Sequence, residues 1–217
     1  RTNDVTDLRV LKAFRSVERE KFVPKARQAL AYSDSHVELG EGRYLVRPRE
    51  FSKMVQAADI QPTDVVLDIA CGRGYSSAIL AQLAETVVAL EDTEERVNRA
   101  SAALIESDVS NAAVLQGSLK SGAAEHGPFH VILVNGAVPS VPKTWLAQLA
   151  HGGRLVAVVQ DGPVGRACVF TRSGDAVGEP AAWSTALYLD GTEVDEIVFV
   201  DTHIDTWIAR GAQPADR

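Results

Sequence analysis

The chain has 217 residues with 22 Lys or Arg and 29 Asp or Glu, which gives a formal net charge of −7. This charge argues against a protein that binds a nucleic-acid backbone, because such proteins carry a basic patch or stripe. No apolar stretch reaches the roughly 18 residues that span a bilayer, and no signal-peptide pattern begins the chain. The two cysteines, Cys71 and Cys168, provide no disulfide framework, so we expect free thiols in a single-domain cytoplasmic protein.

The N-terminal part of the chain predicts two helices separated by irregular structure. Apolar residues recur at a helical period over residues 5–17, where Asp4 or Thr6 can cap the helix. The apolar positions of this helix are Val5, Leu8, Leu11 and Phe14. Residues 22–48 contain many turn-forming residues, so irregular or short extended structure is expected there, and a second helix follows over residues 51–58.

From residue 65 onward, strands and helices alternate. The expected strands are 65–69, 87–91, 113–116, 131–134 and 155–159. The expected helices are 76–84, 94–106 and 143–149. Strands separated by helices of this length indicate a parallel sheet with right-handed crossovers. Closely spaced β-rich runs follow, and they predict antiparallel strands that finish the sheet, at 167–171, 185–189 and 194–200.

The most informative motif is the run V-V-L-D-I-A-C-G-R-G at residues 65–74. A β-branched strand that carries Asp68 and leads into a glycine-rich turn opens a nucleotide-sized crevice in parallel α/β sheets. Gly72 and Gly74 suit a turn that needs positive φ and close approach by a ligand. Glu91 ends the next apolar run, near the spacing of roughly 20 residues at which a carboxylate meets a ribose. The expected ligand is a nucleoside-bearing cofactor.

Glycine-rich turns serve both dinucleotides and S-adenosylmethionine. A pyrophosphate binder prefers G-x-G-x-x-G, but Ser77 stands at the position of the third glycine. Asp68 would repel a pyrophosphate, whereas it could attract the ammonium group of a methionine moiety, directly or through water. The pattern favours S-adenosylmethionine, and a dinucleotide site or a plain strand–turn–helix stays open on these residues alone.

Segments on both sides of the turn resemble the protein-L-isoaspartate O-methyltransferase family of class I S-adenosylmethionine-dependent methyltransferases. Upstream, R-E-K-F-V-P at 19–24 and A-Y-S-D at 31–34 are similar to the family's R-x-x-F-V-P and A-Y-x-D. Downstream, residues 127–142 resemble its fourth strand and proline-bearing loop, and residues 148–156 resemble the Q-L-x-x-G-G-R-L-V that leads into strand five.

The resemblance implies an α/β, Rossmann-like class I methyltransferase fold. Its central, mostly parallel seven-stranded sheet would have helices on both faces and an antiparallel C-terminal strand. Residues 1–217 would form a single domain with three parts. These are an N-terminal helical and substrate-side segment (1–61), a cofactor-binding core (62–160) and a C-terminal β-rich completion (161–217).

The resemblance also implies which residues hold S-adenosylmethionine. Asp68 and the glycine turn would hold its methionine end, Glu91 its ribose, and residues 117–119 would lie near its adenine. Ala70 stands where the family usually has its first glycine, and in the family's G-D-G segment Ser118 replaces the acid and Leu119 the second glycine. The predicted cofactor-binding residues are Asp68, Ala70, Cys71, Gly72, Gly74, Glu91, Asp92, Gly117, Ser118, Leu119 and Asn135.

The substrate segment departs from the family pattern. The family has roughly G-x-x-x-T-I-S-x-P, whereas residues 40–48 are G-E-G-R-Y-L-V-R-P. Val46 takes the position of the family's functionally important serine, so we assign no catalytic residue. Tyr44, Val46 and Arg47 are the predicted substrate-side residues. Arg47 could pair with a carboxylate or lie in solvent, and Tyr44 could offer a hydroxyl or simply pack.

The predicted function is methyl transfer from S-adenosylmethionine to a carboxylate, the isoaspartyl residue of a damaged protein. A carboxylate is already ionised at pH 7, so orientation and exclusion of water matter more than a base. The alternative is an S-adenosylmethionine-binding relative without isoaspartyl activity, which uses another acceptor or acts as a non-catalytic sensor or interaction module. The expected partner is a protein or peptide bearing isoaspartate or another carboxylate, with no metal, nucleic acid or membrane.

Overall fold

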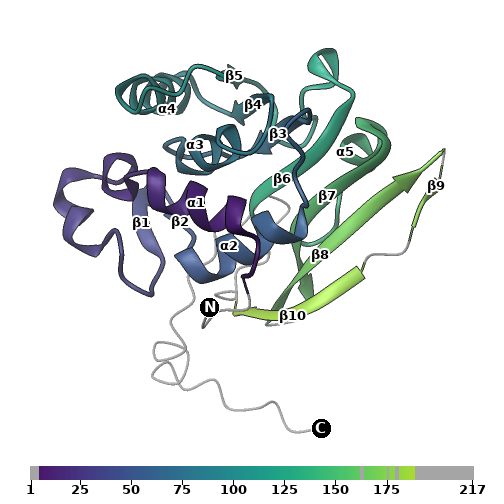
Figure 1. The fold of residues 1–217 in the computed structure, drawn as a ribbon, viewed down its shortest axis with the longest axis horizontal. Coiled ribbons are helices and arrows are strands. Elements are labelled where there is room, and N and C mark those ends of the chain that lie inside the picture. Colours follow the sequence, from purple (N-terminus) through teal and green to yellow (C-terminus); the bar gives the residue numbers. More distant parts are fainter. Residues whose placement is uncertain (1–4, 162–163, 175, 179–180, 189–217) are drawn as a thin grey trace, which may run out of the picture.

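The structure is a computed structural model that describes residues 5–161, 164–174, 176–178 and 181–188 (Figure 1). Its α-helices are α1 (Leu8–Ser16), α2 (Pro48–Ala57), α3 (Tyr75–Ala81), α4 (Glu94–Glu106) and α5 (Lys143–Ala147). The 3₁₀ helices are η1 (Arg19–Phe22), η2 (Lys25–Leu30) and η3 (Ala124–His126). The strands are β1 (Val37–Gly40), β2 (Arg43–Leu45), β3 (Val65–Ile69), β4 (Thr86–Glu91), β5 (Ala112–Gln116), β6 (Phe129–Val138), β7 (Leu149–Asp161), β8 (Val164–Ser173), β9 (Ala176–Val177) and β10 (Ala181–Tyr188).

The main sheet is mostly parallel and ends in antiparallel strands, as predicted. Its order is β10-β8-β7-β6-β3-β4-β5. Strands β7, β6, β3, β4 and β5 pair in parallel, whereas β8 pairs antiparallel with both β7 and β10. Seven strands lie along this path and the short β9 pairs with β8, so the sheet has eight strands within the described residues. The strand expected at 194–200 falls outside the described residues.

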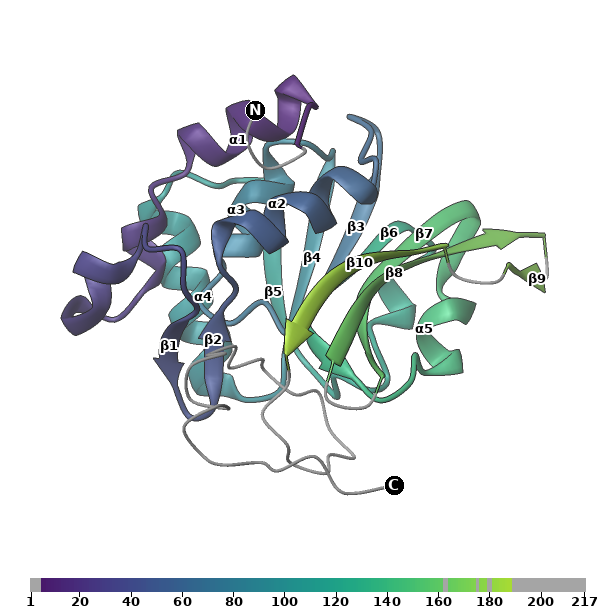
Figure 2. The same cartoon turned by 90° about the horizontal axis from the view of Figure 1, so that it is seen from below.

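Helices cover both faces of this sheet, as predicted, because successive side chains of a strand point to opposite faces. On β3, Val66 joins a core that includes Phe51 of α2 and Ile79 of α3. The next residue, Leu67, joins a second core that includes Trp145 of α5. Figures 1 and 2 show α1, α2 and α3 on one side of the sheet and α5 on the other. Within the part of the chain that is described, none of the helices is long and apolar enough to cross a membrane.

The N-terminal helix differs from its prediction in its cap and in one core residue. α1 begins at Leu8, and the side chain of Asp7 caps it by accepting a hydrogen bond from the Arg9 N–H at 2.8 Å. The cap is therefore neither Asp4 nor Thr6, because the helix begins later than predicted. Leu8, expected on the packed face, is 77% exposed and adds nothing to the core.

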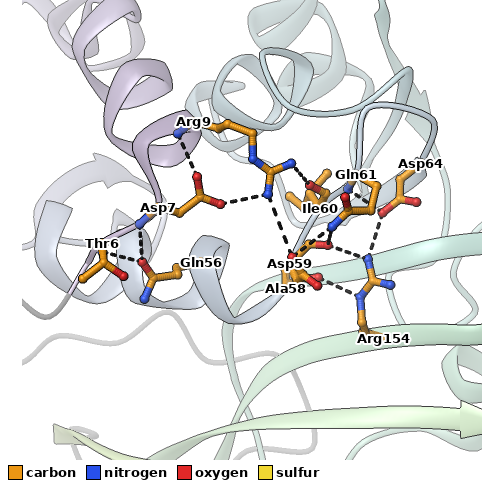
Figure 3. Close-up of polar contacts among 10 residues, drawn as sticks. All are labelled: Thr6, Asp7, Arg9, Gln56, Ala58, Asp59, Ile60, Gln61, Asp64 and Arg154. Atoms are coloured by element: carbon orange, nitrogen blue, oxygen red, sulfur yellow. Dashed lines mark hydrogen bonds and ion pairs between the residues drawn. The ribbon is translucent and has the colours of Figure 1, made fainter.

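A polar network joins the N-terminal segment, the loop after α2 and strand β7 (Figure 3). Gln56 Oε1 in α2 accepts the backbone N–H of Thr6 at 2.6 Å. Arg154 of β7 donates Nε to the Ala58 carbonyl and Nη2 to Asp64 Oδ2, each at 2.8 Å. Arg154 is the arginine of the G-G-R-L-V motif, so this part of the motif fixes the loop that leads into β3.

The segment at residues 22–48 contains short extended structure, as predicted, together with a 3₁₀ helix. It holds η2 and an antiparallel hairpin, in which Val37 of β1 pairs with Leu45 of β2. The helix expected from residue 51 already begins at Pro48, because proline suits the first turn of a helix. The hairpin β1–β2 therefore leads directly into α2, which packs on the sheet.

Candidate active site

The carboxyl ends of β3, β4 and β6 meet at one edge of the sheet. The chain passes from β3 outward to β4 and β5 and then returns to β6 on the other side of β3. Parallel α/β sheets bind ligands at such a switch point. Asp68 and Glu91 lie near the ends of β3 and β4. Asn135 lies where the register of β6 with β7 shifts between Leu133 and Ala137, an irregularity that can re-aim a side chain toward a site.

The turn after β3 holds its backbone in the left-handed region, which glycine adopts most easily. The φ angle is 61° at Ala70, 63° at Gly72 and 89° at Gly74. A Cβ on Gly72 would lie 3.3 Å from Leu39 Cδ1, and a Cβ on Gly74 would lie 3.2 Å from Leu104 Cγ. The two glycines therefore let the turn pack closely against β1 on one side and α4 on the other.

Asp68 holds the glycine turn and the start of α3 from beneath. Its carboxylate is fully buried and accepts three side-chain hydrogen bonds. Ser76 Oγ and Ser77 Oγ donate to its Oδ2 at 2.7 and 2.6 Å, and Asn135 Nδ2 donates to its Oδ1 at 2.6 Å. Asp68 therefore ties β3, α3 and β6 together.

We expect Asp68 to make the stability of the fold depend on pH. Burial raises the pKa of Asp68 from 3.8 to about 6, although hydrogen bonds from Ser77, Ser76 and Asn135 oppose the shift. Because the folded state holds this proton more tightly, the stabilising contribution is fully present below about pH 4 and is lost as the pH rises through about 6. Relative to Asp68→Asn, the parent should lose up to about 3 kcal/mol of unfolding free energy across that range.

The measurement is urea unfolding of both proteins at several pH values between 4 and 7. The Asp68→Asn variant serves as the reference because its amide does not titrate. A difference between the two proteins that stays constant over the range would contradict the prediction.

Glu91 is also fully buried, and its partners come from the turn and the hairpin. Its Oε1 accepts the Gly72 N–H at 2.7 Å, and its Oε2 forms an ion pair with Arg43 Nη2 at 3.0 Å. Burial raises the pKa of Glu91, and the positive charge of Arg43 opposes that shift. Arg43 is not among the predicted site residues, because an arginine beside turn glycines suggests an exposed basic spot.

A pocket that is partly open to solvent lies between the glycine turn and the hairpin β1–β2, and the space among its lining atoms, open solvent included, is about 350 Å³. One wall comes from the turn, α3 and β6, and the other from the hairpin and α2. Its lining residues are Leu39, Arg43, Tyr44, Leu45, Val46, Phe51, Ala70, Cys71, Gly72, Tyr75, Ser76 and Asn135. Burial raises the pKa of the Cys71 thiol well above its usual value. The thiol therefore stays neutral and lines the pocket without acting as a nucleophile.

The pocket brings together six of the predicted site residues and leaves the others outside. The predicted residues in its lining are Tyr44, Val46, Ala70, Cys71, Gly72 and Asn135. The predicted residues outside its lining are Arg47, Asp68, Gly74, Glu91, Asp92, Gly117, Ser118 and Leu119. Arg47 pairs with the buried Glu50, Ser118 is exposed, and Leu119 packs against the core under α5. The ligand contacts assigned to these residues stay predictions.

Arg19 supports the pocket from behind and is also absent from the predicted set. It is 1% exposed, and it donates Nε to the Ala31 carbonyl at 2.6 Å and Nη2 to the Val46 carbonyl at 2.7 Å. Its Cζ lies 4.7 Å from the centre of the Tyr75 ring, within reach of a cation–π interaction. Val46 and Tyr75 both line the pocket, so Arg19 joins two parts of its wall. The R-x-x-F-V-P motif was the only sequence signal for this residue.

A family model and individual relatives with similar sequences all carry the same family name. A family model for Protein-L-isoaspartate(D-aspartate) O-methyltransferase (PCMT) matches residues 1–193. A protein-L-isoaspartate O-methyltransferase of Methanoculleus marisnigri is 36% identical over 159 residues, which are 73% of this chain and 72% of the relative. A protein of the same name from Yersinia enterocolitica is 34% identical over 175 residues, which are 81% of this chain and 84% of the relative.

Solved structures share the fold. A protein-L-isoaspartate O-methyltransferase superposes with a TM-score of 0.73 at 23% identity, covering 86% of this chain and 62% of that chain. A Plasmodium falciparum protein assigned to the same family, in complex with S-adenosyl-L-homocysteine, gives a TM-score of 0.71 at 16% identity and covers 91% of this chain and 93% of that chain. These superpositions confirm the predicted class I methyltransferase fold. Since the family model and the relatives cover most of its length, the chain belongs to the protein-L-isoaspartate(D-aspartate) O-methyltransferase family.

Proposed function

We propose that this protein transfers a methyl group from S-adenosylmethionine to a carboxylate, the isoaspartyl residue of a damaged protein or peptide. The observation that carries the proposal is the pocket between the glycine turn and the hairpin. Ala70 and Gly72 lie on its turn side, and Tyr44 and Val46 lie on its hairpin side. An acceptor held against the hairpin would therefore meet a cofactor held against the turn. Membership of the family supports this reaction class.

The residues present fit S-adenosylmethionine well at the turn and less closely at the ribose. Gly72 places bare backbone at the pocket, and Asn135 presents a polar side chain there, so both would contact the methionine end. Asp68 would act by holding the turn, since its oxygens already accept three hydrogen bonds. Glu91 stands at the ribose position but is covered by Arg43. When bound, the cofactor supplies a sulfonium methyl group for in-line displacement by an acceptor oxygen.

The chain's own residues would orient the acceptor and keep water away from it. Leu45, Val46 and Phe51 give the hairpin side of the pocket an apolar surface, which would strip water from an entering carboxylate. Arg19 fixes the backbone of this wall by its hydrogen bond to the Val46 carbonyl. The acceptor carboxylate is ionised at pH 7, so no residue of the chain needs to take a proton.

Calorimetry with S-adenosylhomocysteine tests the cofactor part of the proposal. We expect saturable heat and a rise in the unfolding temperature of the intact protein, because a ligand that binds only the folded state stabilises it. Absence of both at millimolar ligand would contradict the proposed cofactor.

Transfer of a labelled methyl group to an isoaspartyl peptide tests the acceptor. We expect the parent to be active and Val46→Ser to raise kcat/KM by about tenfold, because a hydroxyl at this position can donate a hydrogen bond to the acceptor carboxylate. Val46→Ala is the matched control, since it removes the same methyl groups without adding a hydroxyl. A parent that binds S-adenosylhomocysteine but leaves the isoaspartyl peptide unmethylated would overturn the isoaspartyl assignment.

A binding relative without isoaspartyl activity is the second candidate function. Val46 favours it, because no hydroxyl stands at the position of the family's serine. Such a protein would either methylate another carboxylate or use the bound cofactor as a signal. A different labelled acceptor, found with the cofactor site intact, would support this candidate over the first.

The partner and the location proposed from the sequence rest on composition. We propose a protein or peptide substrate, no nucleic-acid or membrane partner, and a cytoplasmic location. The net charge of −7 argues against a nucleic-acid partner. The two buried free thiols, Cys71 and Cys168, suit a reducing compartment such as the cytoplasm.

A further inference from the structure

The ion pair between Arg43 and Glu91 connects the hairpin to the proposed ribose position. Arg43 opens β2, and its Nη2 lies 3.0 Å from Glu91 Oε2 at the end of β4. We propose that Arg43 sets the affinity of the cofactor site by competing with the cofactor ribose for Glu91. This inference rests on the proposed function, because it takes Glu91 as the ribose carboxylate.

Burial makes this competition unavoidable. Glu91 is 0% exposed, so no atom of a ligand can reach either of its oxygens in this arrangement. One oxygen accepts the Gly72 N–H, which belongs to the turn and would remain in place. The other oxygen pairs with the Arg43 guanidinium at 3.0 Å and also accepts the backbone N–H of Asp92 at 3.3 Å. A ribose hydroxyl therefore reaches Glu91 only after Arg43 has moved.

The hairpin itself is anchored, so the movement would be that of the Arg43 side chain. Glu41, in the turn of the hairpin, pairs with Arg96 of α4 at 2.9 Å. Leu39 of β1 lies against Gly72, whose added Cβ would come within 3.3 Å of Leu39 Cδ1. Leu39 and Glu41 both precede Arg43 in the chain, so these two contacts hold the part of the hairpin that leads into it.

Asp92 offers Arg43 a second position. Arg43 Nη2 already lies 3.3 Å from Asp92 Oδ2, so a short shift from Glu91 toward Asp92 keeps the guanidinium within ion-pair distance. The side chain of Asp92 is 38% exposed, whereas that of Glu91 is wholly buried. Arg96 also binds Asp92 Oδ1 at 2.6 Å, which fixes this carboxylate in place. Arg43 can thus exchange a buried partner for a partly solvated one.

Moving Arg43 from Glu91 to Asp92 costs free energy, and this cost lowers the affinity of the site for the cofactor. A buried ion pair must be opened, and the neutral ribose hydroxyls replace a charged donor at Glu91. In a site whose carboxylate had no such partner, the same ribose contacts would contribute fully to binding. Removal of Arg43 should therefore strengthen binding, which is the opposite of what a cofactor-contacting arginine would show.

Calorimetry with S-adenosylhomocysteine on the intact protein tests this inference. We expect Arg43→Gln to lower the dissociation constant by about tenfold, the scale of one hydrogen bond to a charged group. The free variant should unfold at a lower temperature than the free parent, because Glu91 is left buried and poorly paired, and the ligand should raise that temperature more than in the parent. Arg99→Gln is the matched control, because it removes an equal charge from an exposed ion pair with Glu95 on α4. Its dissociation constant should stay within about twofold of the parent's.

A double-mutant cycle with Glu91→Gln separates competition from other effects. In the presence of Arg43, Glu91→Gln should change affinity little, because the lost ribose contacts are offset by the ion pair that no longer has to open. In the Arg43→Gln background, Glu91→Gln should weaken binding by about tenfold or more. Additive effects of the two substitutions, or weaker binding by Arg43→Gln alone, would overturn the inference.

Failure of the inference about Arg43 can be told apart from failure of the proposed function. If the parent binds S-adenosylhomocysteine and Arg43→Gln binds it equally or less well, only the role of Arg43 is lost. If both proteins bind it and Arg43→Gln binds about tenfold more tightly, competition is supported. If no variant binds, the cofactor assignment fails and the role of Arg43 fails with it.

Discussion

Replacing Asp68 by alanine is expected to lower the free energy of unfolding by about 3–5 kcal/mol. The substitution leaves three donors, on Ser76, Ser77 and Asn135, without their acceptor in a site from which water is excluded. Each orphaned buried group costs about 1–3 kcal/mol, and the removed carboxylate also leaves a small void. Urea unfolding at pH 7 measures the change.

Two further variants show whether the loss comes from hydrogen bonding. Asp68→Asn keeps the shape and one acceptor, and its amide can donate to a serine hydroxyl, so most of the stability should return. Ser77→Ala removes one donor while Asp68 keeps the other two, so it should cost about 1 kcal/mol. If Asp68→Ala were as stable as the parent, the three hydrogen bonds would not hold the turn.

Replacing Glu91 by alanine is expected to lower the free energy of unfolding by about 2–4 kcal/mol. The substitution leaves the Arg43 guanidinium in a buried site without its nearer carboxylate and leaves the Gly72 N–H without an acceptor. Asp92 lies within reach of Arg43 and limits the loss. Thermal and urea unfolding both measure the effect.

Glu95→Ala is the control for loss of an acidic residue in the same region. Glu95 lies in the first turn of α4 and pairs with Arg99 at the surface, so its removal should change stability by less than about 1 kcal/mol. Equal losses for Glu91→Ala and Glu95→Ala would show that the buried ion pair contributes no more than a surface pair.

These two carboxylates show what a motif leaves open about its residues. Both were predicted to contact the cofactor, because each lies near the carboxyl end of a parallel strand. In the structure both are fully buried, and their oxygens are taken by the chain's own donors. Asp68 ties the turn to α3 and β6, and Glu91 pairs with Arg43 of the hairpin. A motif specifies where a carboxylate lies along a strand, but its partners come from segments far away in the chain.

The elements that the sequence predicted closely are those set by local patterns. The strand at Val65–Ile69 and the helix at Glu94–Glu106 have the predicted bounds. The strand is signalled by a short β-branched run. The helix is signalled by its cap, Thr93, and by two glutamates in its first turn, so both signals lie within a few residues. The hairpin β1–β2 carries no such signal, since its strands are short and its place depends on the turn and α4. The division of the domain at residues 61 and 160 stays a prediction.

The sequence by itself determined the alternating α/β order, the glycine turn at residues 70–74 and the family, because periodicity and motif spacing are properties of neighbouring residues. Only the tertiary structure decided which side chains meet at the turn. Arg19 and Arg43 come from the N-terminal segment and are brought against Val46 and Glu91 by the packing of the hairpin. A charged residue is held in such a position only when distant partners compensate its burial, and those partners exist only once the chain has folded.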